Sequence, residues 1–144
     1  MGQVRVFMSF DLGHDHDLKE RLLGESLKSY SGFEVVGCSE PARVTDTWKQ
    51  RVRRLICDAD EVIFICGEHT GASVQVAAEI GIAQEEKKPY FLLWGRREVM
   101  CTKPIGARPS DGMYSWTSSI LRDQIAVTLR LAWSREVPER CRRP

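Results

Sequence analysis

Hydrophobic residues in this chain fall into short runs that are separated by amphipathic segments. β-Branched and aromatic residues fill Val4–Phe10, Phe33–Cys38, Glu61–Cys66 and Tyr90–Trp94, and a polar residue or a glycine follows each run. Runs of this length and composition predict β-strands. The run at Glu61–Cys66 is continuously apolar after its first residue, which is typical of a strand that is covered on both faces of its sheet.

The segments between these runs have helical spacing. Apolar side chains recur one turn apart in the first two segments, at Leu18, Leu22 and Leu23 and then at Trp48, Val52, Leu55 and Ile56. Asp15 or Asp17 can cap the first of these helices. Asp17 with Glu20 and Thr47 with Gln50 have the spacing of a capping box, which predicts where these two helices begin. Trp48 starts the apolar stripe of its helix, so we expect it in the core rather than at a ligand.

Two more helices and one weak strand complete the expected elements. A third helix is expected from about Ser73 to Glu86, and a final one from about Ser115 to Trp133. The segment from Gly95 to Gly112 is irregular, and a short fifth strand is expected near Met100. Residues 1–134 therefore form one domain, and the charged tail 135–144 is expected to be disordered.

Strand and helix alternate along this domain, which predicts parallel strands joined by right-handed crossovers. The simplest result is an α/β fold, a flavodoxin-like doubly wound sheet of strand order 2-1-3-4-5. Ligands of such sheets bind outside the carboxyl ends of the strands, at the switch point beside the first strand. We therefore expect the functional face at residues 9–15, 38–40 and 67–73 and in the loop after Trp94.

Composition narrows the class of partner. The 144 residues carry a formal net charge of +1, and 42% are hydrophobic and 28% charged, as in an ordinary folded domain. This balance creates no field that would attract nucleic acid or an anionic membrane. The apolar runs are also too short to cross a bilayer. We therefore expect neither a nucleic-acid nor a membrane partner.

The start of the chain and its cysteines bear on the compartment. The first residues lead directly into a strand pattern, without the pattern of a signal peptide. The five cysteines are an odd number without CxxC spacing. These features predict a cytoplasmic protein with free thiols and no zinc site.

Several ligand motifs of this fold class are missing. The sequence contains no GxGxxG, no GxxxxGK[ST] and no GxSxG, which argues against a dinucleotide fingerprint, a P-loop and a hydrolase elbow. The third strand runs into Cys66-Gly67-Glu68, so the aspartate that a phospho-accepting receiver domain needs at that point is also missing.

Glu79 is the conspicuous residue of the third expected helix. It is the one charge between Ser73 and Gln84, on the margin of a helix that is apolar nearly all round. On one interpretation its carboxylate is partly desolvated or aimed into a cleft. On the other, it reaches solvent past small alanines or pairs with an arginine of a neighbouring helix. The pattern alone favours neither interpretation.

An ordered set of segments resembles TIR domains. They are Val4–Asp11, Thr47–Ile56, Asp58–Ile63, Gly67–Thr70, Val76–Ala83 and Lys88–Gly95. The last three are closest to the bacterial TIR-like proteins that include the Thoeris anti-phage TIR subunit (ThsB-type) group. The resemblance extends from about Val4 to Leu129, which is nearly the whole chain.

The resemblance implies a specific activity. Catalytic TIR domains carry a glutamate six residues after a serine, a spacing that Ser73 and Glu79 keep, so the catalytic role carries over to Glu79. NAD is then the expected substrate, with no cofactor. Cleavage of its nicotinamide–ribose bond gives linear or cyclic ADP-ribose, which in Thoeris-like systems is a diffusible messenger that reaches a separate effector in anti-phage defence.

Two other functions stay open. Gln75 and Val76 replace the Trp-Cys pair that usually lies between the serine and the glutamate. This departure fits a catalytically inactive TIR-like scaffold, since TIR domains also act through self-association. A small nucleotide-binding protein that performs no chemistry is the third alternative.

The residues expected to bind substrate lie in the strand-end loops. They are Ser9, Phe10, Asp11, Ser39, His69 and Ser73. Phe10 would stack on a base, although a strand-end aromatic is also ordinary core; His69 would touch substrate or end a turn.

The first loop is acidic, because Asp11, Asp15 and Asp17 would repel a pyrophosphate unless a cation such as Arg96 or Arg97 offsets them. His14 to Asp17 alternate histidine and aspartate, but helix capping is a better explanation than a metal, so no metal is expected.

Overall fold

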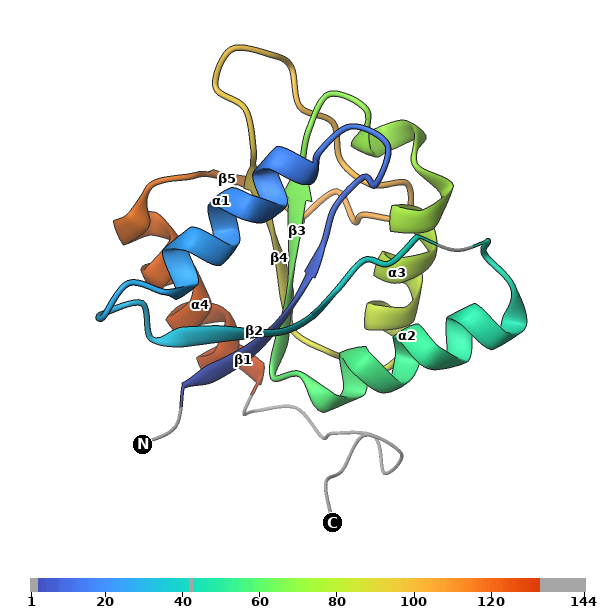
Figure 1. Cartoon of the computed structure of the whole chain (residues 1–144), viewed down its shortest axis with the longest axis horizontal. Helices are drawn as coiled ribbons and strands as arrows, with labels where there is room; N and C mark the ends of the chain where they lie inside the picture. Colours follow the sequence, from blue (N-terminus) through green and yellow to red (C-terminus); the bar gives the residue numbers. More distant parts are fainter. Residues whose placement is uncertain (1–2, 42, 133–144) are drawn as a thin grey trace.

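The computed structural model describes residues 3–41 and 43–132. Five parallel strands form one sheet of order β2-β1-β3-β4-β5, which confirms the expected order (Figure 1). The elements are β1 (Val4–Ser9), α1 (His16–Ser26), β2 (Phe33–Cys38), α2 (Asp46–Asp58), β3 (Glu61–Cys66), the 3₁₀ turn η1 (Thr70–Ala72), α3 (Val74–Glu85), β4 (Tyr90–Trp94), β5 (Met113–Ser115) and α4 (Ser118–Ala132).

Helices cover both faces of the sheet. On one face, side chains of β1, β3 and β4 pack with α2 and α3, and Trp48, Val52 and Ile56 supply the contribution of α2. On the other face, the alternate side chains of the same strands pack with α1 and α4. All six residues of β3 are buried, as expected for a strand with helices on both sides. Trp48 is therefore core, as its pattern predicts.

The last strand is not where the sequence pattern put it. β5 is Met113–Ser115, whereas the expected strand near Met100 does not form. β5 has only three residues and takes its place by pairing with Leu92–Trp94, so tertiary pairing rather than an apolar run defines it. α4 consequently begins at Ser118 instead of Ser115.

The capping predictions are confirmed only in part. The N-cap of α2 is Thr45, whose side chain accepts from the backbone N–H of Trp48, and Thr47 lies inside the helix. The N-cap of α1 is Asp15, one of the two expected candidates, although it makes no side-chain cap bond. The physical reason is that its carboxylate lies against an arginine from another loop.

The cysteines only partly match the expectation of free thiols. Cys38, Cys66 and Cys101 are free, but Cys57 is disulfide-bonded, so the prediction is wrong for Cys57. Within the described residues, no helix is long and apolar enough to cross a membrane. The expected tail 135–144 lies outside the described residues.

Candidate functional site

Four polar side chains meet where β1 and β2 end and α3 begins. Ser9 Oγ donates to Glu79 Oε1 at 2.6 Å, and Ser39 Oγ donates to the same oxygen at 2.7 Å. Gln75 Nε2 donates to Glu79 Oε1 at 2.5 Å and to Ser39 Oγ at 2.8 Å. These four residues, which we call the Glu79 cluster, lie at the switch point of the sheet, where the strand order predicts a ligand site.

The sheet fixes the two serines of the cluster. Ser9 is the last residue of β1. Ser39 follows β2 directly, where its N–H donates to the carbonyl of Met8 at 3.1 Å and its Oγ accepts from the N–H of Phe10 at 3.2 Å. Backbone groups of β1 therefore hold both donors in place against Glu79.

Glu79 is completely buried, with 0% of its surface exposed. Its Oε1 accepts all three hydrogen bonds, whereas its Oε2 has no partner. Burial raises the pKa of this carboxyl to about 7, and the hydrogen bonds from Ser9, Ser39 and Gln75 oppose the rise. The interpretation in which Glu79 reaches solvent past alanines is wrong. The group is a desolvated acid whose charge changes near neutral pH.

The other expected site residues occupy the surrounding loops. Ser73 is the N-cap of α3, and its Oγ accepts from the N–H of Val76. His69 precedes η1 and is exposed. Asp11 is buried, with its carboxylate near the N–H of Gly13 and the ring of His14. The hydrogen bonds of Glu79 come from Ser9, Ser39 and Gln75 rather than from these three residues, so their role toward a substrate stays a prediction.

Phe10 lies in the core. Its side chain is fully buried in the cluster between the sheet, α1 and α4, with an edge-on contact to His16 at 5.5 Å between ring centroids. This is the position of a packing residue in the closed protein. Stacking of Phe10 on a base therefore stays a prediction that needs the loop to move.

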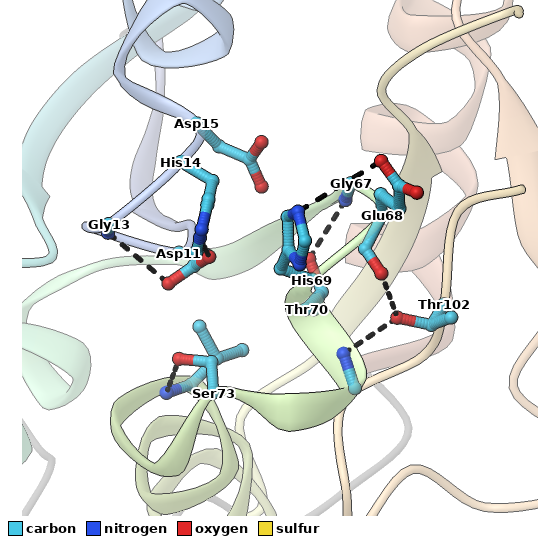
Figure 2. Close-up of polar contacts among 12 residues, drawn as sticks. Asp11, Gly13, His14, Asp15, Gly67, Glu68, His69, Thr70, Ser73 and Thr102 are labelled. Atoms are coloured by element: carbon cyan, nitrogen blue, oxygen red, sulfur yellow. Dashed lines mark hydrogen bonds and ion pairs between the residues drawn. The ribbon is translucent and has the colours of Figure 1, made fainter. Parts of the chain in front are cut away.

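A pair of stacked histidines joins the loops that follow β1 and β3. The rings of His14 and His69 lie 3.8 Å apart at an interplanar angle of 26°. His14 Nδ1 lies 2.5 Å from Asp11 Oδ2, and His69 lies beside Glu68 (Figure 2). His14 was not among the expected substrate-binding residues. The signal was weak, because stacking between two loops leaves no pattern in the sequence.

Arg96 pairs with two of the three aspartates of the acidic first loop. Its guanidinium contacts Asp17 at 2.7 Å and 2.8 Å, Asp15 at 3.1 Å and the carbonyl of His14 at 3.2 Å. Burial raises the pKa of Asp15, and Arg96 opposes that rise; the hydrogen bond from Arg96 lowers the pKa of Asp17. A cation from the loop after β4 thus offsets part of the repulsion that the sequence predicts for a pyrophosphate, while Asp11 contacts Gly13 and His14 instead.

The Glu79 cluster coincides neither with a metal centre among the described residues nor with the cavity at the far end of α3. Among the described residues, no group of three or more histidines, cysteines, aspartates and glutamates is placed to hold a metal ion. A cavity of about 370 Å³ lies instead where the end of α3, the start of β4 and α4 meet, lined by Gln84, Tyr90, Asp111 and Val127 among others. In this structure Glu79 is closed off from solvent.

Comparisons with known proteins support the fold. The crystal structure of a prokaryotic SEFIR domain matches with a TM-score of 0.51 and 21% sequence identity, over 91% of this chain and 99% of that chain. No family model and no curated protein sequence matches this chain. An identity this low shows the fold alone. The strand order, the two helical layers and this likeness together establish that the chain has a flavodoxin-like fold of the TIR type.

Proposed function

We propose that this chain is a TIR-like enzyme that cleaves the nicotinamide–ribose bond of NAD with the carboxylate of Glu79. The observation that carries the proposal is the burial of Glu79 at the switch point without a counter-charge among its contacts. Burying a carboxyl group in this way opposes folding, so it is typical of a group that the protein keeps for chemistry.

The reaction suits a lone carboxylate. When the bond between C1′ of the ribose and the pyridine nitrogen breaks, its electron pair leaves with neutral nicotinamide, so no strong general acid is needed. C1′ becomes oxocarbenium-like, and a preorganised negative charge close to it stabilises the transition state, typically by about 10²- to 10³-fold in rate. Water then forms the new C1′–O bond and releases a proton, which gives ADP-ribose. An oxygen or nitrogen of the same molecule would give a cyclic isomer.

The cluster assigns a role to each oxygen of Glu79. Ser9 and Ser39 hold Oε1 and so fix the orientation of the carboxylate. Oε2 has no partner, which leaves it available to a ribose hydroxyl or to the positive charge that develops at C1′. Because only the ionised form stabilises a cation, the rate should rise with pH and level off above about pH 7.

The proposal also covers the product of the reaction and the protein that receives it. The product would be a messenger of the ADP-ribose type, made in the cytoplasm and passed by diffusion to a separate effector, as in the Thoeris anti-phage systems that the sequence resembles. Self-association through TIR-like surfaces would accompany activation, since Glu79 is closed in the single chain.

Product analysis tests this function. The purified chain is incubated with NAD when dilute and when driven to self-associate by crowding, and products are separated by chromatography and identified by mass spectrometry. The expected result is one nicotinamide for each linear or cyclic ADP-ribose formed, with turnover that falls in Glu79→Gln. Unchanged turnover in Glu79→Gln would remove Glu79 from the mechanism.

The closure of Glu79 also favours a second candidate, a catalytically inactive interaction module. In that case the cluster is only a buried polar network that fixes α3 against β1 and β2. Reversible self-association, with intact NAD recovered under every condition above, would support this function and contradict the enzymatic one.

A further inference from the structure

Gln75 differs from its partners in the Glu79 cluster. Ser9, Ser39 and Glu79 are 0%, 3% and 0% exposed, whereas Gln75 is partly exposed. Gln75 lies in the first turn of α3, one turn before Glu79, so its side chain extends over the same face of the helix. Of the four side chains, it is the one that borders both Glu79 and solvent.

The amide of Gln75 holds this position through two hydrogen bonds. Its Nε2 lies 2.5 Å from Glu79 Oε1 and 2.8 Å from Ser39 Oγ. Ser39 is bonded to the backbone of β1 on its other side, and Glu79 is fixed within α3. Rotation about the side-chain bonds of Gln75 would break both of its hydrogen bonds without any change in the sheet or in the helix.

We propose that Gln75 is a cover for Glu79: the closed protein shields the carboxylate with this amide, and a ligand reaches Glu79 when the side chain swings out. The proposal rests on the proposed function, because it names the step that admits the substrate. The position of Gln75 is also one of the two where the sequence departs from the Trp-Cys pair.

The cover also selects the kind of ligand. When the amide leaves, Glu79 Oε1 keeps its donors Ser9 and Ser39, and Ser39 Oγ keeps the N–H of Phe10, but each loses one hydrogen bond. Glu79 Oε2 still has no partner, and a buried acceptor without a partner is unfavourable. A ligand with two neighbouring hydroxyl groups, such as a ribose, supplies two donors, one to Oε1 in place of the amide and one to Oε2, which has no partner in the closed state. A deoxyribose replaces one donor fewer. NAD should therefore bind better than its deoxyribose analogue at the same ribose.

Chemical labelling of Glu79 tests the cover without relying on turnover. The folded chain is treated with a water-soluble carbodiimide and glycine ethyl ester, and the labelled peptides are quantified by mass spectrometry. Gln75→Ala is compared with wild type and with Gln84→Ala, a control on the same helix whose amide bonds Tyr90 and the carbonyl of Gly106. If Gln75→Ala does not fold, Gln75→Ser takes its place.

Glu79 should stay protected in wild type and in Gln84→Ala. In Gln75→Ala its labelling should rise by about tenfold or more, the factor expected when hydrogen bonds that hold the closed state are lost. Buried Glu61, at the other end of the sheet, should stay unlabelled in all forms. Equal protection of Glu79 in Gln75→Ala would overturn the cover, as would joint labelling of Glu61, which indicates general unfolding. Labelling as expected without NAD turnover would keep the cover and reject the proposed function.

Discussion

Glu61 should make this protein less stable as the pH rises, and replacing it by glutamine should remove that loss. It is the first residue of β3, 0% exposed, and neither carboxyl oxygen has a hydrogen-bond partner. Burial, together with the nearby charge of Asp60, raises the pKa of Glu61 to about 9. At neutral pH the folded chain therefore keeps a proton on Glu61 that the unfolded chain has released.

The sign and the magnitude follow from this difference in bound protons. Between the ordinary pKa of 4.5 and the folded value of about 9, the free energy of unfolding falls by about 1.4 kcal/mol for each pH unit. Relative to wild type, Glu61→Gln should therefore gain about 3 kcal/mol of stability between about pH 5.5 and about pH 7.5. The gain compares the stability difference between variant and wild type at two pH values. Any effect of the glutamine amide on packing is the same at both pH values and therefore cancels.

Urea unfolding followed by tryptophan fluorescence measures this gain, with Glu79→Gln as the matched control. The pKa of Glu79 is raised only to about 7. Between about pH 7.5 and about pH 8.5 the Glu61→Gln advantage should grow by about another 1 kcal/mol, while that of Glu79→Gln should stay level. An advantage of Glu61→Gln that does not change with pH would show that Glu61 is ionised or hydrated in the folded protein, and would refute the reasoning.

Three further substitutions have clear expectations. Gly67→Ala should destabilise the fold by about 1–3 kcal/mol in urea unfolding, because its Cβ would lie 2.5 Å from a buried oxygen of Asp15; an unchanged midpoint would contradict this contact. Lys87→Gly should stabilise by about 0.5–1 kcal/mol, because Lys87 has a φ of 52° at the end of α3, and a lower melting temperature would count against this. Arg96→Ala should destabilise by about 1–3 kcal/mol, since it leaves the buried carboxylate of Asp15 without its cation; wild-type stability would show that solvent reaches that carboxylate.

The fold was predictable because its signals are local. The continuous apolar run of β3 and the stripe that Trp48 begins on α2 each depend on neighbouring residues, and together they imply a parallel sheet in the observed order. β5 was not predictable in this way. Its three residues form a strand because β4 offers an edge, and that edge exists only in the folded chain.

The sequence predicted the central residue of the candidate site but not the contacts that bury it. Glu79 stood out as a lone charge, but its burial depends on Ser9 and Ser39, which are 70 and 40 positions away. The role of Gln75 was not predictable for the same reason, since its amide bonds Ser39, which is 36 positions away in the sequence. Glu61 gave no signal at all, because a charged first residue of a strand is ordinarily exposed, and only packing from both faces buries it.

The central claim is that the carboxylate of Glu79 carries out the cleavage of NAD, and nicotinamide release by three forms of the 144-residue chain tests it most directly. The forms are wild type and two variants, Glu79→Gln and Glu61→Gln. Each variant removes one buried carboxyl group. Under the crowding that drives self-association, we predict release by wild type and by Glu61→Gln, and a loss of about 10²-fold or more in Glu79→Gln. Equal release by all three forms, or equal loss in both variants, would contradict the claim.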